Sequence, residues 1–225
     1  MTSHLDEQRA RRNMSTVLQP RLFSASDTYA ATELSISDLF LSTMEEIENL
    51  SSDNHQPGTI KISCMPSPVG PLLLGVQEQS LRFVYFGQPE RLMEQLLRLQ
   101  QQLKKPLRAA PHRLLEQAEE ELSDYFAGNR QEFTVSLKAI GTPFQEKVWQ
   151  ALREIPFGST WSYEQLATRI GQPTASRAVG LANGANPISI IIPCHRVINK
   201  DGQLGGYGGG MWRKEWLLNL EQQQK

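Results

Sequence analysis

The pattern that most constrains the fold is a pair of helix-start signals in the last third of the chain. In Thr142-Pro143-Phe144-Gln145, threonine is a good cap, proline takes the first helical position and glutamine stands three residues after the cap. Ser162-Tyr163-Glu164-Gln165 repeats this capping box. We expect the second helix to reach Ile170, a break at residues 171–173, and a further helix over 174–185. Two helices joined by a short glycine-containing turn are typical of a helix-turn-helix.

The region before these helices shows strand patterns followed by helix patterns. Apolar residues alternate over 60–64, and apolar runs cover 72–76 and 81–86, which predicts a small antiparallel sheet. Leucines spaced by three or four predict a helix over 92–103, and the apolar residues Leu115, Ala118, Leu122 and Phe126 predict another that ends at Gly128. A strand is expected over 133–137. The predicted fold class is therefore α+β: an N-terminal domain over 58–140, with a small antiparallel sheet and helices, then a mostly helical domain over 141–225.

Residues 1–57 differ in composition from the rest of the chain. They are rich in serine, threonine and acidic residues, with nine acidic side chains against four arginines. We interpret them as a partly disordered leader in which residues 36–50 have the pattern of a helix.

Composition and charge narrow the class of protein. No apolar run approaches the length of a membrane span, so no membrane association is expected. Cys64 and Cys194 are too few for a disulfide framework, which favours a reducing compartment, the cytoplasm. Residues 141–225 carry nine basic and six acidic side chains, a balance that permits contact with DNA phosphates without proving it.

The helix expected over 174–185 is composed almost entirely of small residues, and Arg177 is its one charged side chain. It lacks the long side chains that usually read base edges in the major groove, whereas small residues let a backbone approach a groove closely. On this interpretation Arg177 fills the place of an extruded base. The alternative is that the small residues only pack against a neighbouring helix.

Cys194 interrupts an apolar run that begins at Ile190, and His195 and Arg196 follow it directly. Thiolate is the reactive form of cysteine, and neighbouring cationic or imidazole groups lower the pKa of a thiol. Cys194 is therefore a candidate nucleophile, although a lone buried cysteine is often only structural. Because neighbouring side chains diverge in extended structure, His195 would act on the thiol through a water or from a turn.

Ile192-Pro193-Cys194-His195-Arg196-Val197 resembles the active-site signature of the O6-alkylguanine-DNA alkyltransferases. Further motifs match that family in order and spacing: Thr142-Pro143-Phe144-Gln145, Ser162-Tyr163, Ser176-Arg177-Ala178-Val179-Gly180, Asn186-Pro187-Ile188, Gly205-Gly206-Tyr207 and Lys214-Glu215-Trp216-Leu217-Leu218. Residues 183–190 are similar to the bacterial single-domain members. The resemblance covers 142–221 closely and 68–128 loosely, and it does not cover the leader.

The resemblance implies a role for several matched positions. Cys194 would accept the alkyl group, and His195 and Glu221 would form a water-linked relay that takes its proton. Asn186 would brace the turn that carries Cys194 through hydrogen bonds to backbone. Tyr163 would crowd the flanking phosphate and donate a proton toward the leaving base.

Other matched positions are implied to contact the DNA or the extruded base. Arg177 would enter the base stack where guanine left, with Ala178 and Gly180 on the same DNA-binding helix. The substrate pocket would include Val197, Tyr207, Gly208 and Lys214, with the Cys194 and Val197 carbonyls and the backbone N–H groups of Tyr207 and Gly208 reading the guanine edge. Some relatives have serine where this chain has Gly208, so a hydroxyl contact to O6 would be lost here.

The implied activity is DNA repair by a methylated-DNA-cysteine S-methyltransferase. The protein would flip O6-alkylguanine, and also O4-alkylthymine, out of double-stranded DNA and transfer the alkyl group to Cys194. Extrusion costs a few kcal/mol. Because the thioether has no good leaving group, each molecule would react once. No cofactor is expected, and the protein would act as a monomer.

Three other functions compete with this one. An alkyltransferase-like module senses damage without chemistry, but in that group the acceptor cysteine is replaced. A Cys-His hydrolase would need an oxyanion hole and a base in direct contact with the thiol, and would leave Arg177 unexplained. A transcription regulator would need a larger leader with more cysteines.

We also expect no metal. Some relatives carry a structural zinc in the N-terminal domain, but here its ligands would come from His4, His55, Cys64 and His112 at no recognised spacing. Cys64 is interpreted as a strand residue that faces the core.

Overall fold

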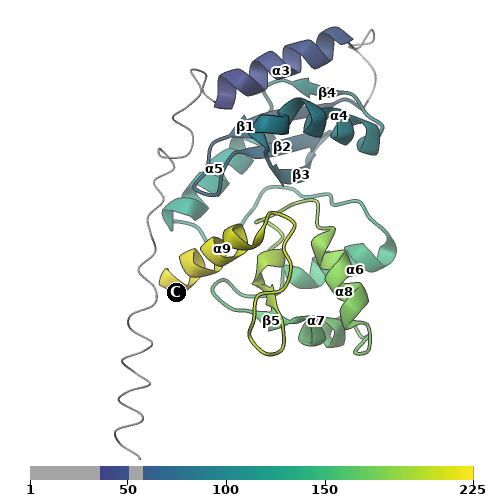
Figure 1. The fold of residues 1–225 in the computed structure, drawn as a ribbon, viewed down its shortest axis with the longest axis vertical. Helices are drawn as coiled ribbons and strands as arrows, with labels where there is room; N and C mark the ends of the chain where they lie inside the picture. Colours follow the sequence, from purple (N-terminus) through teal and green to yellow (C-terminus); the bar gives the residue numbers. More distant parts are fainter. Residues whose placement is uncertain (1–35, 51–57, 225) are drawn as a thin grey trace, which may run out of the picture. The chain divides into compact units, whose positions relative to one another are not determined.

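The computed structural model describes residues 36–50 and 58–224 (Figure 1), and these described residues belong to one compact unit. The rest of the predicted leader lies outside the described residues. Sheet and helices follow one another along the chain as the α+β prediction requires, and that prediction is confirmed.

A four-stranded sheet with the order β3-β2-β1-β4 forms the first part of the fold. Strands β1 (Ile60–Met65), β2 (Leu72–Gln77) and β3 (Ser80–Phe86) are antiparallel, as the alternating apolar residues predict. The fourth strand, β4 (Leu107–Ala109), pairs with β1 in parallel, so the sheet is mixed and not purely antiparallel. This strand was not predicted, because three residues carry no readable period.

Each face of the sheet packs against its own helices, because successive side chains in a strand point to opposite faces. Leu73 and Phe83 lie in one apolar cluster with α3 (Ile36–Leu50) and α4 (Leu92–Leu103), which follows a short 3-10 turn, η1 (Pro89–Arg91). Leu72 and Leu74 lie in a second cluster with α5 (Arg113–Ala127). The helix predicted over 36–50 is thus confirmed, and it covers the sheet through Phe40 and Met44.

The strand predicted over 133–137 is not formed. Only Leu137 makes an isolated bridge, to Leu81. The buried carboxylate of Glu121 accepts hydrogen bonds from the backbone N–H groups of Thr134 and Val135, at 2.9 and 3.2 Å, and from the Thr134 hydroxyl. Donors that a sheet ladder would need are therefore used by a side chain on α5.

The second part of the fold is mostly helical. Its elements are α6 (Pro143–Leu152), β5 (Trp161–Ser162), α7 (Tyr163–Arg169), α8 (Ser176–Gly184), the 3-10 turn η2 (Cys194–Arg196), β6 (Val197–Ile198) and α9 (Met211–Gln223). Both predicted capping boxes are present, Thr142 with Gln145 and Ser162 with Gln165. Helices α7 and α8 and the turn between them form the predicted helix-turn-helix.

The two parts share one apolar cluster. It contains Leu115 and Tyr125 of α5 together with Trp149 of α6 and Leu217 of α9. A backbone bridge joins Val84 of β3 to Ile188. The domain boundary expected near residue 140 therefore stays a prediction. No described helix has the length and apolar character needed to cross a membrane.

Candidate active site

Helix α8 is anchored by its buried face and exposes the opposite one. Val179, Ala182 and Asn183 are buried, and the Trp149 indole donates a hydrogen bond of 2.8 Å to the Ala182 carbonyl, which ties α8 to α6. Arg177 and Ala178 are exposed and Gly180 is half-buried. Both interpretations of the small residues therefore hold in part. Some of them pack against neighbouring helices, and others form an open face beside Arg177 that could approach a DNA groove.

Asn186 fixes the turn that leads to Cys194. Its side-chain amide donates to the Ile192 carbonyl at 2.8 Å and to the Cys194 sulfur at 3.1 Å, and its oxygen accepts from the Ile188 N–H at 3.0 Å. Ile190, between these contacts, has a φ of 72°, which a β-branched residue rarely adopts. The hydrogen bonds of Asn186 therefore hold a strained turn at the position where the thiol is presented.

The Cys194 thiol is buried, and its pKa is raised because burial penalises the thiolate. The hydrogen bond from Asn186, the positive charge of Lys214 and the Tyr207 hydroxyl act in the opposite direction. The Tyr207 hydroxyl affects the thiol electrostatically but has no partner of good hydrogen-bond geometry among the described residues. At neutral pH the group is a thiol that must lose its proton before it can attack.

His195 and Arg196 meet at a single carboxylate, that of Glu221 on α9. His195 Nε2 lies 2.8 Å from Glu221 Oε1, and Arg196 donates from Nε at 2.9 Å and from a terminal nitrogen at 3.0 Å. The Tyr125 hydroxyl donates at 2.8 Å and the Gly158 N–H at 3.0 Å. Although burial alone would raise the pKa of Glu221, hydrogen bonds and charges from His195 and Arg196 lower it to about 2.

This cluster determines the protonation of the imidazole. The ionised Glu221 only accepts, so Nε2 of His195 carries the hydrogen. Burial lowers the pKa of His195, which keeps the ring neutral, and Nδ1 is then a free acceptor with no partner among the described residues. His195 is thus a buried base oriented by a carboxylate, on the same turn as the thiol.

An open hollow of about 790 Å³ lies along the exposed face of α8. Its walls come from α8, from Tyr163 at the start of α7, and from the glycine-rich loop around Tyr207 and Gly208. A Cβ at Gly205 would lie 2.7 Å from the Tyr163 hydroxyl, so glycine is needed for the loop to approach this ring. The hollow combines a guanidinium, two phenols and a backbone-rich rim.

Two family models match the chain. The model of the "6-O-methylguanine DNA methyltransferase, DNA binding domain" matches residues 143–223, and that of the "ribonuclease-like domain" of the same family matches residues 60–139. Together they cover more than half of the sequence. The chain belongs to the 6-O-methylguanine DNA methyltransferase family.

Individual members of the 6-O-methylguanine DNA methyltransferase family agree with this assignment. A methylated-DNA–protein-cysteine methyltransferase of Salmonella typhimurium is 49% identical over 160 residues, which are 69% of this chain and 91% of that protein. One of Methanosarcina acetivorans is 44% identical over 161 residues, 69% of this chain and 94% of that protein. The crystal structure of Mycobacterium tuberculosis OGT in complex with DNA matches with a TM-score of 0.63 and 43% identity, over 74% of this chain and 94% of the other.

The structure brings most of the site residues named from the sequence into one region. Cys194, His195, Asn186 and Glu221 form the buried part, and Tyr163, Arg177, Gly180, Tyr207 and Gly208 line the hollow. Val197 and Lys214 are fully buried and do not line it. The Lys214 ammonium donates to the carbonyls of Val197, at 2.6 Å, and of Gly205, at 3.2 Å, so it joins the strand after Cys194 to the glycine-rich loop.

One expectation about the site is wrong, and one residue of the site was missed. The sequence predicts Arg196 as a cation that lowers the pKa of Cys194, but its guanidinium is bound to Glu221 and to the Ile155 carbonyl. The cation that lowers the pKa of the thiol is Lys214. Tyr125 belongs to the loosely matched helix end 125–128 but was not assigned to the site, because its partner Glu221 lies 96 residues away in the sequence. The available signal was a tyrosine that continues the three- and four-residue spacing of Leu115, Ala118 and Leu122.

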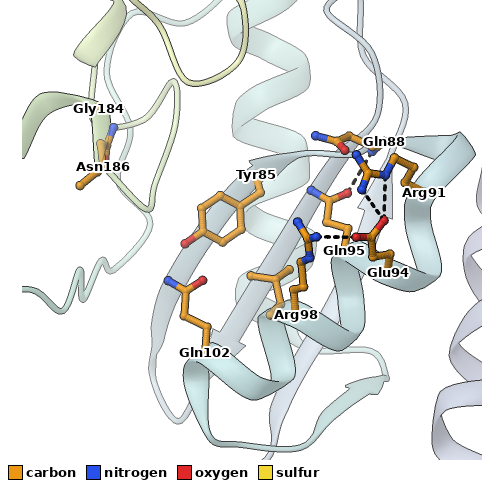
Figure 2. Close-up of a pocket in the computed structure, with 11 residues that line it drawn as sticks. Tyr85, Gln88, Arg91, Glu94, Gln95, Arg98, Gln102, Gly184 and Asn186 are labelled. Carbon is orange, nitrogen blue, oxygen red and sulfur yellow. Dashed lines mark hydrogen bonds and ion pairs between the residues drawn. The ribbon is translucent and has the colours of Figure 1, made fainter. Parts of the chain in front are cut away.

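A second hollow, of about 400 Å³, lies beyond Gly184 and Asn186. Figure 2 shows its other side, where Arg91 and Arg98 both point to the carboxylate of Glu94. The lining residues include neither a thiol nor an imidazole. This hollow therefore lacks the thiol and imidazole pair that Cys194 and His195 form.

Among the described residues no group of three or more histidine, cysteine or acidic side chains is arranged to hold a metal ion. His4 and His55 lie outside the described residues. His112 caps α5, with Nδ1 accepting from the Leu114 N–H, and Cys64 is half-buried on β1 with its pKa raised to about 12, chiefly by burial.

Proposed function

We propose that this protein repairs double-stranded DNA by transferring the alkyl group of O6-alkylguanine, or of O4-alkylthymine, irreversibly to Cys194. The observation that carries the proposal is the buried Cys194, which shares a turn with a base oriented by Glu221 and interacts electrostatically with Tyr163 and Tyr207, two residues that line the hollow along α8. DNA binding by a helix-turn-helix and alkyl transfer to cysteine are the activities of the family to which the chain belongs.

The reaction would be a displacement at the alkyl carbon. His195 Nδ1 takes the thiol proton through a water, and the sulfur of Cys194 forms a bond to the alkyl carbon while the bond from that carbon to O6 breaks. The Tyr163 hydroxyl donates a proton toward the leaving guanine. Because Glu221 has a pKa of about 2, it stays ionised and stabilises the imidazolium that forms.

Access to the alkyl group would require the base to leave the duplex. The exposed face of α8 would lie in a groove with Arg177 in the vacated place, and the base would enter past Tyr163, Tyr207 and Gly208. The thioether has no good leaving group, so each molecule would act once. We expect a cytoplasmic monomer that needs no cofactor.

The deciding experiment is intact-protein mass spectrometry after mixing with duplex DNA that contains one O6-methylguanine. The expected result is a stoichiometric gain of one methyl group, located on Cys194 and absent from Cys194→Ser. Tight binding without a mass gain would instead favour a module that senses damage.

A further inference from the structure

Leu181 on α8 is the most exposed large apolar side chain in the part of the chain that the structure describes, with 74% of its surface open. It stands four residues after Arg177, and residues at this spacing lie one turn apart on the same face of a helix. Both side chains line the hollow along α8. Leu181 is thus next to the side chain that we expect to fill the vacated base position.

The packing of α8 does not explain this exposure. The helix is held on its other side, where Val179, Ala182 and Asn183 are buried. The Ala182 carbonyl accepts from Trp149 of α6 and the Asn183 amide donates to the Cys194 carbonyl, whereas Leu181 is exposed. A leucine at this position therefore contributes little to folding.

The residues around Leu181 differ from it in size. Gly180, Gly184 and Ala185 share the wall of the hollow with it, and all three are small. A face of small residues lets a helix backbone approach a groove closely, but a leucine in its middle would keep the groove at a distance unless the side chain enters it. Proteins that bind the minor groove insert apolar side chains such as leucine between base steps and partly unstack them.

We propose that Leu181 is a second positioning residue for base extrusion: its side chain enters the minor groove and unstacks the base step beside the one that Arg177 fills. This inference rests on the proposed function. Arg177 would replace the lost stacking partner, and Leu181 would lower the energy needed to open the stack. Leu181 touches neither the thiol nor the alkyl group, so its effect would be confined to duplex substrates.

The test compares two alkyl donors under single-turnover conditions. With duplex DNA that contains O6-methylguanine paired to cytosine, Leu181→Ala is expected to react about 10-fold more slowly, since unstacking one step costs a few kcal/mol and a tenfold rate is 1.36 kcal/mol. With the free base O6-benzylguanine its rate should equal that of the unchanged protein. Placing the alkylguanine in single-stranded DNA should remove most of the difference, because no stack has to be opened.

Matched variants separate this role from other effects. Leu181→Met keeps a long apolar side chain and should retain the duplex rate, whereas Leu181→Asn, of similar size but polar, should not. Leu97→Ala removes a leucine that is 38% exposed on α4 and should change neither rate. The proposal is overturned if Leu181→Ala keeps the duplex rate, which is the result expected if Leu181 is a contact surface for another protein. It is also overturned if Leu181→Ala reduces both rates equally, which is the result expected of a purely structural residue. Failure of the proposed function is recognised separately, because the unchanged protein would then accept the alkyl group from neither donor.

Discussion

Glu221 accepts hydrogen bonds from side chains and backbone in three separate stretches of the chain, around residues 125, 158 and 195. A fully buried carboxylate is tolerated only when such donors replace water. The same contacts hold the tautomer of His195, so the residue that stabilises the fold here also prepares the base. Stabilising the fold and orienting the base therefore depend on the same contacts of Glu221. The ionisation of Glu221 can nevertheless be tested through the pH dependence of the free energy of unfolding.

Glu221→Gln is expected to reduce the free energy of unfolding by about 3 kcal/mol or more at pH 7, because the guanidinium of Arg196 stays buried without its counter-charge. The pKa of Glu221 is lowered from 4.5 to about 2 on folding, so its contribution is fully present above pH 4.5 and is lost as the pH falls toward 2. Urea unfolding at pH 7 and pH 3 should therefore show a smaller difference between the two proteins at pH 3.

A surface ion pair provides the control for this variant. Glu164 bonds to Lys200 with both side chains largely exposed, and Glu164→Gln should cost under about 1 kcal/mol. A penalty for Glu221→Gln that stayed constant from pH 7 to pH 3 would contradict the assigned ionisation.

Lys214→Met is expected to slow transfer from O6-benzylguanine at neutral pH. The Lys214 charge lowers the pKa of Cys194 against the effect of burial, so its removal should move the rise of the rate to higher pH. The pKa of Lys214 is itself lowered to about 8 by burial, so the two proteins should converge above that pH as the charge disappears. A pH–rate profile checks this, with the exposed Lys147→Met as control, and parallel profiles would be inconsistent with it.

The residues of the site were predictable where the chemistry is local. Cys194 and His195 stand out in an apolar run, and the family resemblance supplied Asn186 and Glu221. Closeness in sequence did not predict which way the Arg196 side chain points relative to the Cys194 thiol. The two residues lie in a 3-10 turn, where successive side chains point about 120° apart. Tyr125 could not be assigned either, since its partner is 96 residues away.

At the scale of elements, predictions held where a local rule determines the structure. The capping boxes at Thr142 and Ser162 and the glycine end of α5 at Gly128 each satisfy their own hydrogen bonds, so sequence alone marks them. The segment 133–137 has strand composition, but the Glu121 carboxylate, not a neighbouring strand, receives its N–H groups. Whether this segment forms a strand is decided by the Glu121 side chain on α5, and no pattern within residues 133–137 indicates that contact.

Helix α3 offers a prediction at this scale, because Phe40 and Leu41 are adjacent but differ in burial. Phe40 is 4% exposed in the cluster between α3, α4 and the sheet, whereas Leu41 is 53% exposed. Phe40→Ala should lower the free energy of unfolding by about 3 kcal/mol, a typical cost for a buried phenylalanine. Leu41→Ala should change it by under about 0.5 kcal/mol, as exposed substitutions do. Equal effects in chemical denaturation would mean that α3 does not cover the sheet.

For the whole described molecule, the central question is whether the sheet and the helix-turn-helix region unfold as one unit. One apolar cluster includes side chains of β2, α5, α6 and α9, and the Tyr125 hydroxyl crosses from α5 to Glu221. The sequence suggested two domains because composition and motifs change near residue 140, but the sharing of core residues is a tertiary property that local patterns do not carry. Contacts this extensive favour a single cooperative transition.

The distribution of tryptophan makes this testable. All four tryptophans, at positions 149, 161, 212 and 216, lie after residue 140, so their fluorescence reports only the second part, whereas far-UV circular dichroism reports both. Phe40 belongs to the other cluster, on the opposite face of the sheet from the one that the second part contacts. If the parts unfold together, Phe40→Ala should shift the urea midpoint of tryptophan fluorescence as far as that of circular dichroism. A fluorescence midpoint that stays in place while the dichroism curve splits would establish two independently stable domains, and the boundary near residue 140 would then be energetic as well as compositional.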